Sequence, residues 1–284
     1  MHIDTNQVLP PVKPSHKPIV YDTYFTNDGK AKPLVIFCHG YKGFKDWGPW
    51  HLVAKAFAQA GFFFLKFNFS HNGGTAKQPI DFPDLEAFAQ NNYSLELEDV
   101  DRVLNFIYSN SIYKNQIDIS KINLIGHSRG GGIVLIKAQE DSRVAKVVTW
   151  AGVSDYKVRF QENTPGFLEF KKQGVYHVQN GRTMQQMPHY WQFYTDFLAN
   201  EKRLTIKRAA QELQKPLLIV HADQDTTVPL QEAQNLHQWC KGSELFIVPD
   251  ANHVFNGKHP YPETSMPAML DAVVAKTVLF LRAI

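Results

Sequence analysis

Cysteine is scarce in this chain of 284 residues, which contains only Cys38 and Cys240. Two cysteines so far apart favour free thiols in a reducing compartment over a disulfide framework, so we expect a cytoplasmic protein. Long apolar runs are also missing, because none reaches the roughly 18 residues that span a membrane. The first residues lack the basic and apolar regions of a secretory signal. We therefore expect no membrane partner.

An excess of charge of either sign is absent as well. The 30 basic and 27 acidic residues leave a net charge of +3, which with no run of five basic residues argues against nucleic acid as a partner. None of the 12 histidines belongs to an H-E-x-x-H motif, and no C-x-x-C pair exists, so we expect no metal and no cofactor. A hydrophobic content of 44% with 20% charged residues is instead typical of a soluble globular protein.

Strand-like apolar stretches alternate with amphipathic helical stretches along most of the chain. The nearly continuous apolar run at 62–69 predicts a strand that is covered on both faces. Such alternation predicts an α/β fold, a mostly parallel sheet flanked by helices, with the active site at the carboxyl ends of the strands. We also expect residues 19–26 and 32–39 to form an antiparallel hairpin. Residues 1–18, which contain four prolines, should form an irregular arm.

One segment interrupts this alternation. About 60 residues separate the strand that ends near Trp150 from the strand that begins at Pro216, whereas a crossover needs only about a dozen. We predict that residues 153–212 form an inserted helical cap within a single domain of residues 1–284. Most aromatic side chains of this insertion should pack it against the body of the protein. Some should line a pocket at the carboxyl ends of the strands and bind substrate there, and the candidates are Tyr190, Trp191 and Tyr194.

The most informative motif is Gly126-His127-Ser128-Arg129-Gly130, which directly follows the strand-like stretch 121–125. A G-x-S-x-G pattern between a strand and a helix is typical of a nucleophile elbow, a sharp turn that exposes the serine hydroxyl. Small glycines beside the serine avoid collisions with the neighbouring strand and helix. Ser128 is therefore the predicted nucleophile.

A serine hydroxyl needs a base within hydrogen-bonding distance, and the base needs an acid that orients it. His253 follows the strand-like stretch 244–248 and is the predicted base. Asp223 and Asp225 both follow an earlier strand, and we favour Asp225 because it lies deeper in its loop. Asp250 is a weaker third candidate, since it precedes the base by only three residues. The order Ser, Asp, His is the order that this topology requires.

The oxyanion formed by such a serine needs preorganised donors. The backbone N–H of Arg129, directly after the nucleophile, should supply one of them. The second should be the backbone N–H of Tyr41, which follows a sharp turn at His39-Gly40 after the first parallel strand. The ring of Tyr41 would then lie beside the acyl pocket.

Together these motifs resemble the α/β-hydrolase superfamily over residues 19–284. The chain looks most similar to dienelactone-hydrolase-like and cinnamoyl or feruloyl esterase-like members, and to the catalytic domains of prolyl-oligopeptidase-type peptidases. The resemblance implies the α/β-hydrolase fold with a helical cap insertion. It also implies a serine hydrolase that cleaves a small-molecule carboxylic ester with an apolar or aromatic acyl group through an acyl-enzyme.

Two other enzymatic activities and one binding function remain as alternatives. A peptidase or an acyltransferase uses the same triad. A non-catalytic binding module should have lost a triad member, whereas this sequence retains all three.

Overall fold

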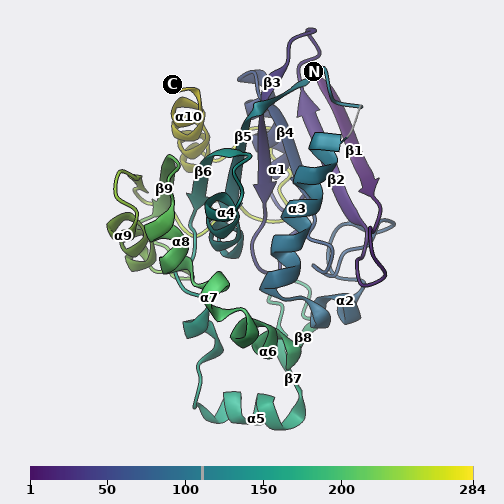
Figure 1. The fold of residues 1–284 in the computed structure, drawn as a ribbon, viewed down its shortest axis with the longest axis vertical. Coiled ribbons are helices and arrows are strands. Elements are labelled where there is room, and N and C mark those ends of the chain that lie inside the picture. Colours follow the sequence, from purple (N-terminus) through teal and green to yellow (C-terminus); the bar gives the residue numbers. More distant parts are fainter. Residues whose placement is uncertain (110–111, 284) are drawn as a thin grey trace.

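The structure is a computed structural model that describes residues 1–109 and 112–283. Positions 110, 111 and 284 of the predicted domain lie outside the described residues. The central sheet consists of β1 (His2–Leu9), β2 (Ile19–Phe25), β3 (Lys32–Cys38), β4 (Phe63–Phe67), β5 (Ile117–His127), β6 (Val144–Trp150), β9 (Leu217–Ala222) and β10 (Glu244–Val248). Their order in space is β1-β2-β4-β3-β5-β6-β9-β10 (Figure 1). From β4 to β10 all neighbouring strands are parallel, which confirms the predicted mostly parallel sheet.

Helices cover both faces of this sheet (Figure 1). One face packs against α3 (Tyr93–Ser109), α4 (Arg129–Glu140), α8 (Ile206–Glu212) and α9 (Leu230–Trp239). The other face packs against α1 (Trp50–Gln59) and α10 (Ala268–Arg282). Strand β4 has apolar side chains on both faces. Phe63 and Phe67 face the core beneath α3 and α4, and Phe64 faces the core beneath α1 and α10. A strand buried on both faces needs apolar side chains on both.

The amino-terminal part of the chain differs from the prediction in two ways. Residues 19–26 and 32–39 do not form a hairpin, because β4 lies between β2 and β3 and pairs with both. The phenylalanine-rich β4 buries more apolar surface in the middle of the sheet than it would at an edge. The predicted irregular arm is also wrong in part, since β1 pairs antiparallel with β2 and the prolines come after it.

We predict a helical cap for residues 153–212, but the inserted segment is only partly helical. It contains a two-stranded antiparallel sheet of β7 (Val175–Gln179) and β8 (Gln186–Tyr190). Strand β8 packs against the short helix α2 (Leu85–Gln90), and α8 packs against α4 as a crossover helix of the main sheet. The other elements are a 3₁₀ turn at Lys157–Phe160, α5 (Pro165–Gln173), α6 (Gln192–Ala199) and α7 (Glu201–Leu204). In Figure 1 the insertion extends beyond the end of the sheet, with α5 at its far end.

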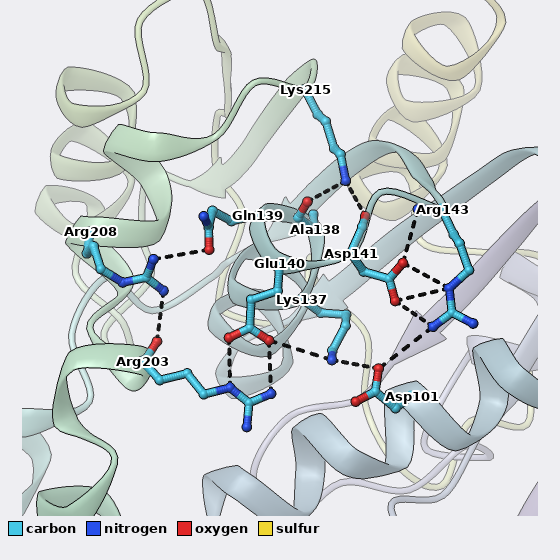
Figure 2. A network of polar contacts seen from close by, with 10 residues as sticks. All are labelled: Asp101, Lys137, Ala138, Gln139, Glu140, Asp141, Arg143, Arg203, Arg208 and Lys215. Carbon is cyan, nitrogen blue, oxygen red and sulfur yellow. Dashed lines mark hydrogen bonds and ion pairs between the residues drawn. The ribbon is translucent and has the colours of Figure 1, made fainter.

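A polar network fixes the end of the insertion to helix α4 (Figure 2). Arg203 of α7 makes a bidentate contact with Glu140, with N–O distances of 2.7 and 2.9 Å. Buried Lys137 lies 2.8 Å from Asp101 of α3, and Arg208 of α8 donates to Gln139 at 3.1 Å. Bidentate arginine–carboxylate pairs are geometrically specific, so this network sets where the chain re-enters the main sheet.

Candidate active site

The predicted nucleophile sits on a strained turn between β5 and α4. Ser128 has φ of 57° and ψ of −120°, a region that residues with side chains rarely adopt. A Cβ on Gly126 would lie 2.1 Å from the carbonyl oxygen of Gly130, and a Cβ on Gly130 would lie 2.5 Å from that of Cys38. Both glycines are therefore needed for the strand and the helix to approach at this angle.

Asp225 and His253 meet at the carboxyl ends of β9 and β10. His253 Nδ1 lies 2.7 Å from Asp225 Oδ2. The other carboxylate oxygen, Oδ1, accepts hydrogen bonds from the backbone N–H groups of Thr227 and Val228, each at 2.8 Å. Burial by itself raises the pKa of Asp225, but the hydrogen bond and charge of His253 together with these N–H groups hold that pKa below its ordinary value. Asp225 is thus an ionised acceptor for His253.

The two alternative acids occupy other positions. Asp223 is exposed in the same loop, and its side chain has no hydrogen bond to His253 among the described residues. Asp250 is also exposed and accepts a hydrogen bond from Gln224 at 3.1 Å. Of the three candidate acids, Asp225 alone is brought to the imidazole.

Ser128 and His253 line the same cavity, which has a volume of about 360 Å³ and is large enough for a small-molecule site. We call it the His253 cavity; its lining also includes His39, Tyr41, Trp47, Trp50 and His127. Within the described residues no direct hydrogen bond joins the Ser128 hydroxyl to the imidazole. Catalytic hydrogen bonds are often long in ligand-free proteins and tighten in the Michaelis complex.

Histidine 39 orients the peptide group that carries the predicted oxyanion donor. Its Nε2 accepts a hydrogen bond from the backbone N–H of Phe69 at 3.2 Å, so the ring proton lies on Nδ1, which donates to Gly40 O at 2.9 Å. Gly43 N donates to the same oxygen at 3.0 Å. In a trans peptide the N–H points opposite to the C=O, which directs the N–H of Tyr41 away from these two donors.

This turn lies directly against the nucleophile. A Cβ on Gly40 would come within 2.8 Å of Ser128 Cβ and 3.3 Å of its hydroxyl oxygen. Arg129 is the first residue of α4, and the first N–H groups of a helix have no acceptor within it. The peptide groups of Tyr41 and Arg129 thus adjoin Ser128, and the prediction that their N–H groups form an oxyanion site remains a prediction.

Two buried histidines beside the site are neutral. Burial lowers the pKa of His39 to about 4, and burial with the nearby charge of His253 lowers the pKa of His127 to about 3. His127 Nε2 donates to the carbonyl oxygen of His253 at 3.0 Å, and the two rings lie 4.9 Å apart. His127 thus helps to fix the backbone of His253.

A second cavity also reaches Ser128. Four tyrosines, Tyr41, Tyr93, Tyr156 and Tyr176, form much of its wall, and we call it the tyrosine cavity. The Arg129 guanidinium lies 4.3 Å from the centre of the Tyr41 ring and 5.2 Å from that of Tyr93. Tyr41 lines both cavities.

The three aromatic residues predicted to bind substrate are not part of either cavity. Trp191 packs against Phe167 and Phe170, with ring centres 5.5 and 4.8 Å away. Tyr190 donates to Glu86 at 2.6 Å, and Tyr194 donates to Glu162 at 2.8 Å. Trp191 and Tyr194 thus pack within the insertion, and Tyr190 joins it to helix α2. Their contact with the acyl group therefore remains a prediction.

The tyrosines that do line the pocket were missed for different reasons. Tyr156 and Tyr176 belong to the aromatic-rich insertion, but nothing in their spacing distinguishes them from its packing residues. Tyr93 begins α3, far from the insertion in sequence, and its ring stacks on Tyr156 with centres 3.8 Å apart. Only the three-dimensional contact reveals that pair.

Among residues 1–109 and 112–283, no three histidine, cysteine, aspartate or glutamate side chains cluster closely enough to hold a metal ion. In the same ranges no helix is long and apolar enough to cross a membrane.

Comparisons with known proteins agree with this fold. The sequence model of the "alpha/beta hydrolase fold" family matches residues 33–212 and 182–260. The chain belongs to this family. A structure of a putative hydrolase from Agrobacterium vitis has a TM-score of 0.74 and 18% identity, covering 99% of this chain and 100% of that one. The esterase Est1E from Butyrivibrio proteoclasticus with bound ferulic acid has a TM-score of 0.68 and 19% identity, covering 93% and 94%.

A relative from Escherichia coli is similar over most of both chains. This uncharacterized 31.7 kDa protein, from the traX-finO intergenic region, is 26% identical in an alignment of 266 positions that covers 81% of this chain and 87% of the relative. The family and the fold therefore agree with the resemblance drawn from the motifs, and the chain is an α/β hydrolase.

Proposed function

We propose that this hydrolase cleaves a carboxylic ester through an acyl-enzyme formed on Ser128. His253 removes the proton from the hydroxyl, and Asp225 keeps the imidazole in the tautomer with its proton on Nδ1. The backbone N–H groups of Tyr41 and Arg129 stabilise the oxyanion, each by about 3 kcal/mol. The observation that carries this proposal is the 2.7 Å contact between Asp225 and His253 in the cavity that exposes Ser128 on its strained turn.

The two cavities suggest how the substrate lies. When the tetrahedral intermediate collapses to the acyl-enzyme, the imidazolium gives its proton to the departing oxygen, so the leaving group must lie on the side of His253. The leaving group therefore occupies the His253 cavity, and the acyl group occupies the tyrosine cavity. Tyrosine rings and the side chains of Val153 and Val178 line the latter, which favours an apolar or aromatic acyl group of modest size.

Labelling with a fluorophosphonate tests the nucleophile directly. The wild-type protein should be labelled and Ser128→Ala should not. Ser70→Ala is the matched control. The Ser70 hydroxyl lies 2.8 Å from His71 Nδ1, but Ser70 is buried and lines neither cavity. Undiminished labelling of Ser128→Ala would refute the assignment.

A panel of substrates then tests the reaction. Aryl esters with acetyl, hexanoyl and cinnamoyl groups should be turned over, and the corresponding anilides much more slowly. Faster cleavage of the anilides would indicate a peptidase. Preferential transfer to added alcohol instead of water would indicate an acyltransferase.

A further inference from the structure

Among the described residues that line the two cavities, the side chains that carry a full charge are all basic. Lys42 and Arg182 line the His253 cavity, and Arg129 and Arg159 line the tyrosine cavity, whereas no aspartate or glutamate among the described residues lines either. A cavity lined by one sign of charge attracts ligands of the other sign.

Three of these four cations already have a carboxylate partner. Arg129 lies 3.4 Å from Glu96, Arg159 pairs with Glu232, and Arg182 pairs with Asp81. The fourth differs, because the ammonium group of Lys42 is 3.4 Å from the carbonyl oxygen of Gln179 and 5.2 Å from the Tyr41 ring centre. In the part of the chain that the structure describes, Lys42 has no carboxylate partner.

The position of Lys42 is costly for the protein. Its φ of 53° lies in the left-handed region that favours glycine. The side chain is half-buried, and burial lowers the pKa of its ammonium group. Strained, desolvated residues with unused charge are characteristic of binding sites. Lys42 also follows directly after Tyr41, so its backbone is tied to the predicted oxyanion turn.

We propose that the leaving group of the natural ester carries an anionic group, a carboxylate or a phosphate, which pairs with Lys42 in the His253 cavity. The inference rests on the proposed function for the assignment of this cavity to the leaving group. Asn180 and Arg182, from the turn between β7 and β8, line the same cavity, so the insertion supplies part of its wall, next to the Gln179 carbonyl that Lys42 contacts. Trp47 and Trp50 add flat apolar surfaces to the cavity.

Two esters with the same acyl group separate charge from shape. 4-Carboxyphenyl acetate carries a carboxylate on its leaving group, and 4-carbamoylphenyl acetate is its neutral isostere. The measured quantity is the ratio of their kcat/KM values, because intrinsic reactivity cancels when this ratio is compared between proteins. 4-Acetoxyphenyl phosphate, tested in parallel, shows whether carboxylate or phosphate is preferred.

Lys42→Met removes the charge and keeps an unbranched side chain. It should lower the carboxylate-to-amide ratio about tenfold, as expected for a charged hydrogen bond at a partly exposed site. Lys42→Arg should keep the ratio within about threefold of wild type. Lys241→Met is the control for net charge, since exposed Lys241 precedes β10 at the opposite end of the parallel strands. An unchanged ratio in Lys42→Met would overturn the proposal.

A binding measurement separates this failure from failure of the proposed function. Ser128→Ala should bind 4-hydroxybenzoate more tightly than 4-hydroxybenzamide in a calorimetric titration, and the additional Lys42→Met substitution should remove that difference. Absence of ester turnover in the wild type would refute the proposed function alone. Equal binding of the two phenols by Ser128→Ala would refute the anion site alone.

Discussion

Replacement of Asp225 by asparagine tests the triad because the backbone around it fixes the orientation of the new amide. Oδ1 of Asp225 accepts two backbone hydrogen bonds of 2.8 Å, from Thr227 and Val228. An asparagine must keep its carbonyl oxygen there, since a flipped amide would place its NH₂ group against two N–H donors. The NH₂ group therefore faces His253 Nδ1, at the position that Oδ2 holds at 2.7 Å in the native protein.

Two donors cannot share that contact, so the imidazole must move its proton to Nε2. In that tautomer His253 offers Ser128 a proton instead of a lone pair and cannot act as the base. Loss of the correct tautomer costs on the order of 10⁴ in kcat, which is about 5 kcal/mol of transition-state stabilisation. The fold should be retained, because asparagine has nearly the same size and keeps both backbone contacts.

The assay is steady-state hydrolysis of p-nitrophenyl acetate by the wild type, Asp225→Asn and Asp223→Asn, with thermal unfolding of each. Asp223→Asn is the matched control, since it makes the same chemical change at an exposed position two residues away. Asp223→Asn should keep kcat within about twofold of the wild type, as expected for a surface substitution. If Asp225→Asn retained more than a tenth of the wild-type kcat, or if the two variants ranked in reverse, the argument from the fixed amide would be wrong.

Four further outcomes follow from the same geometry. Ser128→Ala should lower kcat by at least about 10³ and leave only catalysis from the oxyanion site and binding, whereas activity within tenfold of wild type would exclude Ser128 as the nucleophile. Burial lowers the pKa of His39 to about 4, and burial with the charge of His253 lowers the pKa of His127 to about 3. As the pH falls from 6.5 to 4, these histidines therefore bind protons in the unfolded chain but stay neutral in the folded one. Stability should therefore be complete above pH 6.5 and decrease through this window; a melting temperature constant between these pH values would contradict it. Tyr176→Ala should change the relative kcat/KM values of acetyl and cinnamoyl esters, because Tyr176 lines the tyrosine cavity, and an unchanged acyl preference would remove the cavity from the mechanism. Trp191→Ala should instead lower the unfolding free energy by about 1–3 kcal/mol with little effect on that preference, and a selective effect on long acyl groups would return Trp191 to the pocket.

The sequence predicted those parts of the molecule that depend on local constraints. Gly126 is needed because of its contact with Gly130 in the same turn, so the elbow is legible from five consecutive letters, although Gly130 is needed because of the distant carbonyl groups of Cys38 and His39. The candidate acid and base each follow an apolar strand, and the carboxyl ends of parallel strands share an edge. The meeting of Asp225 with His253 therefore required only the alternation of strands and helices and their order along the chain.

The failures share a different physical cause. A turn-like sequence at 27–29 is compatible with a hairpin, but the pairing partner of β2 was decided by β4, about 40 residues further along the chain. Register and neighbour choice in a sheet depend on where apolar faces are buried globally. Proline content similarly obscured β1, because the prolines begin only at the residue after that strand ends.

Aromatic residues in the insertion illustrate the same limit within the site. Each large ring has similar apolar area, so burial energy alone does not decide whether a ring faces substrate or a neighbouring helix. The distinction comes from contacts with distant segments: Tyr176 stacks on His189, whose ring also hydrogen-bonds to Tyr41 at 2.7 Å. Trp191 contacts only rings of its own insertion among the described residues. A ring's role in this enzyme therefore follows from whether its neighbours reach the oxyanion turn, which composition and periodicity do not encode.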